Sequence, residues 1–509
     1  MFCVTTFEGV DVRRAVKATL ITLVFGGCWL ATTVVHGQIS GMNDLLWASP
    51  RAPGLSHFNN MPTAHYQAFA RRALMDQPAP PPILGQFYLY ANATARAAVI
   101  EDSTLMSTSN GGFLTSAIPV PGEPFFGAPA QNSVSASGSV VELNGISQPW
   151  PTNGGGGSTP AVVNARLVLS NATLRAGSLA PGQQAVALQM VSFQWRRIFV
   201  GLAETAFADT TALPSVFDVT GPTARVTALN GGTGTGNARL SYTWLTPSLT
   251  TTQPGWTSLL SVEQPVAEIQ SGVINNTQSA AFSRYPDFVS TTFYSNGYTD
   301  SAGSYQETFH LQASTVIRSL GVQSADESIV SSTVGWGESV SGMVAVPFTS
   351  GNTYPDALVA SYTVGQGIAH YIVDLQTPTA NLSSGGNDAF LNGANSLVAL
   401  PVSAWYVGFM HNWTNSLQSC LTYSHTSLQS FTPNPIAGTG APPPASPFRR
   451  GDYVQINLQR TRRVRFPSES GPPTHYLQYG IEYIYGQKQT LDGNHGHDHR
   501  GLFVVSLTQ

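Results

Sequence analysis

Apolar and polar side chains alternate with a period of two in many segments between residue 83 and the end of this 509-residue chain. Clear examples are residues 163–169, 310–318, 477–485 and 503–507. Clusters of Gly, Pro, Asn and Ser separate the segments. A period of two places successive side chains on opposite faces of a β-strand. The pattern therefore predicts an all-β fold made of many strands.

The two faces of the predicted strands differ in chemistry. One face carries aliphatic and aromatic residues, whereas the other carries uncharged polar residues with a few Arg and Glu. A transmembrane antiparallel β-barrel places lipid against the first face and water against the second. A soluble β-sandwich with one solvated face is the alternative.

Composition favours the barrel over the sandwich. The chain has 23 Lys+Arg and 27 Asp+Glu among 509 residues, so about one residue in ten is charged, whereas globular proteins average about one in four. Apolar residues still make up 42% of the chain, so intrinsic disorder is excluded. A lipid-facing half that cannot carry charge accounts for both values.

The N-terminus has the organisation of an export signal. Three cations precede an apolar run at residues 18–35, and small or apolar residues follow it. We place the signal peptide at residues 1–37; a transmembrane anchor and a lipoprotein modified at Cys28 are the alternatives. No second apolar run downstream is long enough for a spanning helix. If the chain spans a membrane, its backbone N–H and C=O groups must therefore pair between the strands of a closed barrel.

The mature chain is expected to have two parts. Residues 38–82 form an irregular, Pro-containing N-terminal extension that ends in a semi-rigid Pro-rich run. Residues 83–509 form the outer-membrane β-barrel, with low-complexity loops between strands. Removal of the signal leaves Cys420 as the last cysteine, so no intramolecular disulfide is expected.

Two function classes find little support in the sequence. The only basic run is Arg460–Arg465 near the C-terminus, so nucleic-acid binding is not predicted. Alternation puts these arginines on both faces of a strand, which favours a rim or loop position. The chain has no Gly-x-Ser-x-Gly elbow, and its Gly232–Gly236 run lacks the Lys-Ser/Thr of a phosphate loop. We predict that it is not an enzyme, although a facing Ser/His pair stays open.

Several short patches share their order and spacing with one known family. They are Arg196–Gly201, Phe207–Asp209, Ala212–Pro214, Phe217–Pro222, Arg284–Phe288, Ile317–Leu320, Gly335–Gly337, Gly365–Tyr371, His411–Trp413 and Gly480–Gly486. With these patches, residues 83–507 resemble the DcaP-like trimeric porins of bacterial outer membranes.

The resemblance implies a barrel of 16 strands whose loop at about residues 203–222 folds into the pore and constricts it. It also implies a homotrimer in outer-membrane lipid, with no cofactor. Two features depart from the family. The mature N-terminus lacks the heptads of the coiled-coil extension that some members carry, and the chain ends in Leu507-Thr508-Gln509 rather than in an aromatic residue.

Arginine supplies 21 of the 23 cations, and only Lys17 and Lys488 are lysines. A few fixed charges on a low-dielectric wall can select solutes in a pore, and Arg keeps its charge and matches carboxylates. Alternation places Arg166 and Arg318 on the polar face. The full candidate set for selectivity is Arg166, Arg175, Arg196, Arg225, Arg239, Arg284 and Arg318. In the alternative, these arginines pair with carboxylates of the pore or lie at the membrane interface.

Two further groups have two interpretations each. Asp209 and Asp218 on the inserted loop either form the wall of the pore opposite the arginines or cap turns. His495, His497 and His499 could bind a metal ion with Asp498, but the neighbouring glycines favour a solvated turn between the last two strands. We therefore predict no metal site.

Together these observations predict an outer-membrane porin for passive diffusion of small hydrophilic solutes, with a preference for anions such as small organic acids. The alternative is an exported β-rich surface or adhesion protein without a pore.

Overall fold

The structure is a computed structural model, and it describes most of the predicted barrel. The described residues are 87–104, 112–123, 126–136, 138–147, 161–170, 185–195, 197–227, 236–245, 255–267, 269–270, 279–299, 305–324, 330–346, 355–376, 386–391, 396–429, 448–464 and 475–508. The predicted signal peptide and N-terminal extension lie outside these residues. Among the described residues, no helix is long and apolar enough to cross a membrane.

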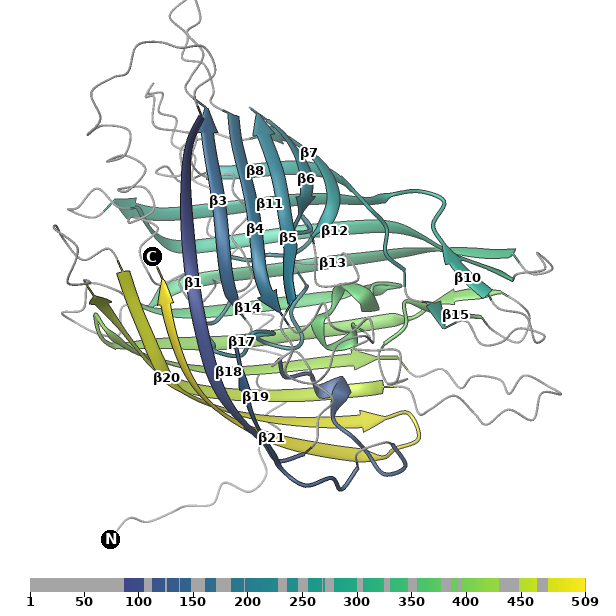
Figure 1. Cartoon of the computed structure of the whole chain (residues 1–509). Helices are drawn as coiled ribbons and strands as arrows, with labels where there is room; N and C mark the ends of the chain where they lie inside the picture. The colour runs from purple at the N-terminus through teal and green to yellow at the C-terminus, as the bar shows by residue number, and fades with distance from the viewer. Residues whose placement is uncertain are drawn as a thin grey trace, which may run out of the picture. The chain divides into compact units, whose positions relative to one another are not determined.

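One large antiparallel sheet dominates the fold (Figure 1). Its first half contains β1 (Phe87–Asp102), β2 (Gln131–Ser135), β3 (Ser139–Ser147), β4 (Ala161–Ser170), β5 (Ala185–Trp195), β6 (Ile198–Ala203), β7 (Asn237–Leu245), β8 (Gly255–Glu263), β10 (Ser279–Phe282) and β11 (Asp287–Thr299). Its second half contains β12 (Tyr305–Ser324), β13 (Val330–Val346), β14 (Asp356–Gln366), β17 (Pro401–Thr414), β18 (Leu417–Leu428), β19 (Phe448–Val464), β20 (His475–Thr490) and β21 (His495–Thr508).

The sheet is a closed barrel of 16 strands, as predicted. Strands β2 and β3 both pair with β1, and β10 and β11 both pair with β12, so each couple is one interrupted barrel strand. The last strand, β21, pairs with β1 from Thr94↔Thr508 to Asp102↔Arg500. This pairing leaves the barrel without an exposed edge.

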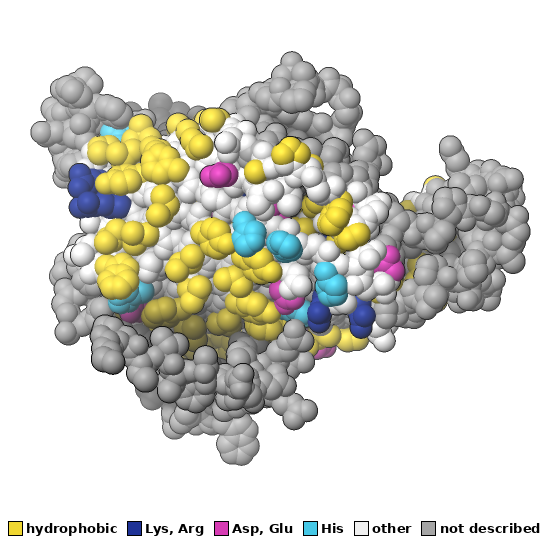
Figure 2. All heavy atoms as spheres, turned by 90° about the horizontal axis from the view of Figure 1, so that it is seen from below, with side chains coloured by type: hydrophobic (Ala, Val, Ile, Leu, Met, Phe, Trp, Pro, Cys, Tyr) yellow, Lys and Arg dark blue, Asp and Glu magenta, His cyan; other side chains and the backbone are white. Residues whose placement is uncertain are grey.

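The outer wall of the barrel is apolar, as the alternation predicted. Ile317, Ile481 and Phe503 are 52%, 59% and 48% exposed, whereas Arg318 and Glu482, which point inward, are 2% and 3% exposed. Figure 2 shows apolar side chains spread over one outer face, with the Lys and Arg side chains near its two ends. The two sides of the wall therefore match the lipid and water faces of a membrane barrel.

Parts of three loops fold into the barrel. These interior segments are residues 112–120 with the 3-10 helix η2 (Thr115–Ala117), residues 204–227, and residues 367–376 with η4 (Ala369–Tyr371) and η5 (Val373–Leu375). A small separate sheet, β9 (Ile269–Gln270), β15 (Ala389–Leu391) and β16 (Leu397–Ala399), packs near β12 and β13.

The interior segments make part of the inner wall apolar, which alternation alone did not predict. Phe207 and Tyr371 pack on inward side chains of β11, β12 and β17, including Val289, Val316 and Val402. Glycines on the strands leave room for this packing. A Cβ at Gly486 would lie 2.4 Å from the Phe113 ring, and one at Gly408 would lie 2.8 Å from Pro214.

The predicted turn at the C-terminal histidines is wrong. The turn between β20 and β21 ends at residue 494, and β21 begins at His495, which pairs with Gln489. Gly493 has a φ of +89°, so the chain reverses within a short turn and the histidines join the strand at once. Alternation then places His495, His497 and His499 on the outer wall.

A charge on the outer wall should destabilise the barrel by an amount that depends on depth. We expect Ile481→Arg to lower the free energy of unfolding from lipid by about 2–4 kcal/mol, because Ile481 is central and lipid-facing. Leu477→Arg on the same face, near the end of β20, is the matched control and should cost about 0–1 kcal/mol. Urea titrations in lipid vesicles measure both, and equal costs would contradict a lipid-facing outer wall.

Candidate functional site

The segment 204–227, which we call the inserted loop, crosses the interior of the barrel. Near its start, the Ala206 N–H donates to Glu263 Oε1 on β8 (2.7 Å), and Thr291 Oγ1 on β11 donates to the Ala206 carbonyl (2.6 Å). Near its end, the N–H groups of Phe217 and Asp218 donate to the carboxylate of Glu482 on β20 at 2.5 and 2.8 Å. The loop is therefore fixed to walls that lie far apart around the barrel.

Asp209 fixes the middle of the inserted loop. Its Oδ2 lies 3.1 Å from His310 Nε2 on β12 and accepts from Ser341 Oγ on β13 at 2.6 Å. Its Oδ1 accepts from the Thr211 N–H and hydroxyl, as in a turn. Burial opposes ionisation of Asp209, but His310 and the hydroxyl donors outweigh it and lower its pKa. The turn interpretation of Asp209 thus applies, while the same carboxylate also attaches the loop to β12 and β13; a position opposite the pore arginines stays a prediction.

Polar side chains of the inner wall complete the attachment of this loop. Tyr406 on β17 donates its hydroxyl to the Ala212 carbonyl at 2.8 Å. Asn457 Nδ2 on β19 donates to the Ser215 carbonyl, also at 2.8 Å. Because neutral donors from the strands satisfy the carbonyls of this irregular backbone, it can lie buried in the barrel.

Asp218 and Asp374 join the three interior segments. Asp218 accepts from the Phe113 N–H at 3.1 Å and from the Thr220 hydroxyl at 2.5 Å. Asp374 accepts from the Ser116 N–H at 3.1 Å and from the Thr115 hydroxyl. Burial raises the pKa of both carboxyls, while these donors lower it in part. The interior segments therefore form one hydrogen-bonded unit.

A row of charged residues follows the inner wall across neighbouring strands. Glu142 on β3 is the cross-strand partner of Arg166 on β4, and their side chains lie 3.5 Å apart. Arg166 also lies 3.9 Å from Glu204 of the inserted loop. Farther around the barrel, Arg239 on β7 pairs with Glu263 on β8 at 4.0 Å. This part of the wall is thus lined by opposite charges in contact.

Arg318 on β12 continues the row and is completely enclosed. Its Nε lies 3.5 Å from Asp287, its Nη1 lies 3.2 Å from Asp388, and its guanidinium stacks on the Tyr371 ring at 5.1 Å. Gly335 on the next strand makes room for this side chain, because a Cβ there would lie 2.9 Å from Arg318 Cγ. Two carboxylates around one guanidinium hold it in a fixed position.

Arg225 differs from the other interior arginines. It belongs to the inserted loop, its Nε donates to the Thr220 carbonyl at 2.6 Å, and it is 7% exposed. Its terminal nitrogens make no hydrogen bond or ion pair with any described residue. Burial lowers its pKa, against the influence of Tyr406, Asp218 and Glu204. Since Arg remains charged even in such sites, this guanidinium is a cation inside the barrel that has no carboxylate in salt-bridge contact among the described residues.

The other predicted residues fall into four groups. Arg166, Arg239 and Arg318 lie inside with carboxylate partners, and Asp209 and Asp218 lie on the inserted loop. Arg284 is exposed in the bend between β10 and β11. Arg175 and Arg196 lie outside the described residues.

Sequence reasoning missed the carboxylates of the interior, chiefly Glu142, Glu204, Glu263 and Asp287. Alternation could have placed Glu142 inside, because it lies on the same face of β3 as Val140, which is 5% exposed. Glu204 follows the end of β6 and gave no periodic signal.

The described residues contain no cluster of His, Cys, Asp or Glu that could hold a metal ion. On the outer wall, the His499 ring bonds the Tyr483 hydroxyl through Nδ1 at 2.5 Å. For the Ser/His pair left open by the sequence, the described strands offer two cross-strand candidates, Ser295 with His310 and Ser419 with His411. The Ser419 hydroxyl accepts from Trp413 Nε1 at 3.1 Å, and His411 Nδ1 lies 2.8 Å from Asp356 Oδ2.

Glu204 should make stability depend on pH. Burial raises its pKa to about 8 from 4.5, although Arg166 and Arg239 oppose the shift. A carboxyl whose pKa is raised on folding binds a proton more tightly in the folded state, so its contribution is complete below pH 4.5 and is lost as pH rises through 8. We expect the free energy of unfolding to fall over this range.

Denaturant titrations in detergent at a series of pH values test this expectation. Glu204→Gln, which mimics the neutral carboxyl, should remove most of the fall. Glu101→Gln, on the exposed outer wall, is the control and should keep it. If the Glu204→Gln profile matched that of the unmodified protein, the burial of a neutral Glu204 would be refuted.

Comparison with known proteins relates this geometry to solved structures. No known protein-family model matches the sequence, and no curated protein matches it. The outer membrane channel DcaP of Acinetobacter baumannii has a similar structure, with a TM-score of 0.56 and 14% identity over 83% of this chain and 97% of that one. An anion-selective porin from Comamonas acidovorans also matches, with a TM-score of 0.39 and 10% identity over 83% of this chain and 99% of that one. With its apolar outer wall and 16 strands, the chain is a β-barrel with the fold of the channel DcaP, which confirms the predicted resemblance to the DcaP-like porins.

Proposed function

We propose that this protein is a porin, a passive channel for small hydrophilic solutes in the outer membrane. The observation that carries the proposal is the closed barrel with an apolar outer wall and an inner wall of Arg, Asp, Glu, Asn, Gln and Ser. Passive diffusion needs a polar path through the bilayer and no catalytic group. The predicted signal peptide at residues 1–37 would deliver the chain for export.

The inserted loop is proposed to narrow the channel. Its attachment to β8, β11, β12, β13, β17, β19 and β20 supports a fixed constriction rather than a swinging one. Residues 203–222, predicted for this role, form most of the loop.

We further propose that the channel favours anions such as small organic acids, and that Arg225 is the principal selecting residue. Arg166, Arg239 and Arg318 have carboxylate partners, so their fields are largely cancelled beyond the contact. Arg225 sits on the inserted loop with its terminal nitrogens unengaged by the described residues. A planar fork of donors in a low-dielectric site is suited to carboxylate groups.

One feature favours the second candidate function, a surface protein without a pore. The three interior segments fill part of the barrel with apolar side chains such as Phe207 and Phe113, both 0% exposed. A barrel closed by such packing would still sit in the membrane but would not conduct.

Planar-bilayer recording decides between the two and tests Arg225. Purified protein should give discrete conductance steps, and the reversal potential in a KCl gradient should indicate anion preference. Arg225→Gln should lower the anion-to-cation permeability ratio by roughly threefold or more, because it removes the unpaired cation of the constriction. Arg284→Gln, at an exposed bend, is the matched control and should leave the ratio unchanged. Absence of conductance would favour the surface protein, and an unaltered ratio in Arg225→Gln would remove the role of Arg225.

We also propose that the protein is a homotrimer, as in the family it resembles. The support is the wide apolar outer wall, which can serve subunit contacts as well as lipid contacts. Chemical crosslinking of the detergent-extracted protein should give a band at about three times the 54.0 kDa of one chain before heating, reduced by the mass of the signal peptide. A single band at one chain mass under saturating crosslinking would contradict the trimer.

A further inference from the structure

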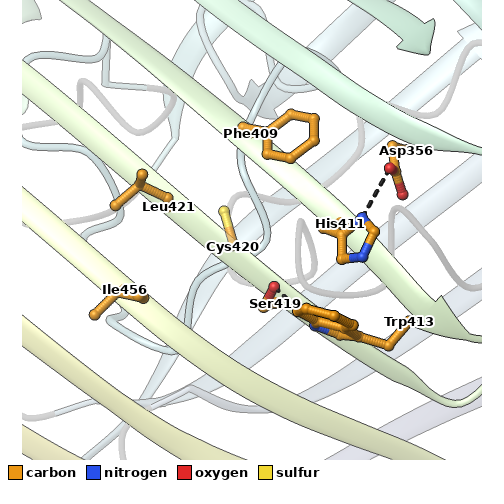
Figure 3. A pocket seen from close by; sticks show the side chains of 8 residues that line it. All are labelled: Asp356, Phe409, His411, Trp413, Ser419, Cys420, Leu421 and Ile456. Atoms are coloured by element: carbon orange, nitrogen blue, oxygen red, sulfur yellow. Dashed lines mark hydrogen bonds and ion pairs between the residues drawn. The ribbon is translucent and has the colours of Figure 1, made fainter. Parts of the chain in front are cut away.

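The outer wall has a groove of about 440 Å³ across β17, β18 and β19 that the proposed channel does not use. Figure 3 shows its lining, with Phe409 beside Leu421 and Ile456 at one end and the His411 and Trp413 rings at the other. The apolar end lies toward the middle of the strands. The ring end lies next to the two-residue turn 415–416.

The polar groups at the ring end of the groove bond to each other within the wall. Asp356, with 0% of its side chain exposed, lies 2.8 Å from His411 Nδ1 and accepts from the Asn412 N–H at 2.8 Å. Ser419 accepts from Trp413 Nε1. The one buried carboxylate of the lining therefore has its hydrogen-bond partners within the wall.

Two cations continue the same face beyond the groove. On β19, Ile456, Leu458, Arg460 and Arg462 share the outward face, and all are exposed. Arg460 is the cross-strand partner of Leu417, which is two residues before Ser419 on the same face of β18. Along the strands the wall thus changes from apolar side chains, to Trp and His, to two arginines.

The orientation of the barrel places this end at the periplasmic surface. Short turns lie on the periplasmic side of such barrels and long loops lie on the outside. The turn 415–416 is at the groove end, whereas the connections from β6 to β7 and from β14 to β17 leave the opposite end. The two arginines are then at the depth of the phospholipid headgroups of the inner leaflet.

We propose that this groove is a binding site for an anionic phospholipid of the periplasmic leaflet. An acyl chain lies along Phe409, Leu421 and Ile456, and the phosphate group meets Arg460 and Arg462. The apolar groove matches a hydrocarbon chain, and the arginines match the negative charge that follows it. A second copy of the chain would need an acidic patch opposite the arginines, whereas a lipid needs no partner surface of that kind.

The test compares lipid retention by intact protein and by variants in native mass spectrometry, after mixing delipidated protein with phosphatidylglycerol or phosphatidylethanolamine. The unmodified protein should retain phosphatidylglycerol in preference. The double variant Arg460→Gln/Arg462→Gln should weaken this retention about 30-fold, which is what two cations near an anionic lipid surface supply. Arg449→Gln, an exposed cation at the other end of β19, is the matched control and should have no effect.

A second variant tests the groove apart from the cations. Ser419→Phe places a ring in the groove and should also reduce phosphatidylglycerol retention, while heat-modifiable migration on gels verifies that the barrel is folded. Inorganic phosphate at millimolar concentration should not displace the lipid. Equal retention of both lipids, no loss in either variant, or displacement by free phosphate would overturn the proposal. Loss of the oligomer in Ser419→Phe without loss of lipid would assign the groove to a second copy instead. Channel conductance is independent of these outcomes.

Discussion

A bilayer offers no hydrogen-bond partner to backbone N–H and C=O groups, and each unpaired group there costs several kcal/mol. The pairing of β21 with β1 satisfies the last strand edge and makes a spanning sheet possible. Once the sheet is closed, each strand residue points either to lipid or to the interior. Ile481 and Glu482 are neighbours on β20, yet one is 59% exposed on the outer wall and the other is 3% exposed inside. Closure thus converts an alternation in sequence into a separation of chemistries.

Charges that point inward meet a second constraint. At about 4 Å, an unscreened pair interacts by about 4 kcal/mol at an effective dielectric constant of 20, so isolated buried charges are costly. On the inner wall, charged side chains form ion pairs with opposite charges on adjacent strands, as in Glu142 with Arg166 and Arg239 with Glu263. The inserted loop contacts the same arrangement, because its Ala206 N–H donates to Glu263. The low charge content of the chain is therefore concentrated where pairs can form.

The sequence was sufficient for features that depend on neighbours along one strand. The inward positions of Arg166 and Arg318 followed from alternation, while the strand number came from the family resemblance. Contacts between distant segments were not predictable, because alternation along a strand does not indicate which loop residues pack against its inner face. Asp388 reaches Arg318 across 70 positions of sequence, and Phe207 and Tyr371 turn the inner face at Val316 into a hydrophobic core. The outward histidines of β21 were missed for a related reason: a tight turn with a positive-φ glycine leaves no loop for them.

The position of Arg225 follows from the way in which the interior segments are joined. Its carbonyl accepts from the Val373 N–H at 3.1 Å, and its Nε donates to Thr220 at 2.6 Å, so both backbone and side chain are held. Next to it, Val226 and Ile372 form a β-bridge. A charge that is held in this way needs no reorganisation when a solute approaches, and fixed charges act more strongly on a passing ion than mobile ones. The other interior arginines, Arg166, Arg239 and Arg318, have carboxylate partners, so their electrostatic fields are weaker at a distance. In the channel that we propose, one guanidinium without a carboxylate in contact can then affect selectivity more than the total number of arginines would suggest.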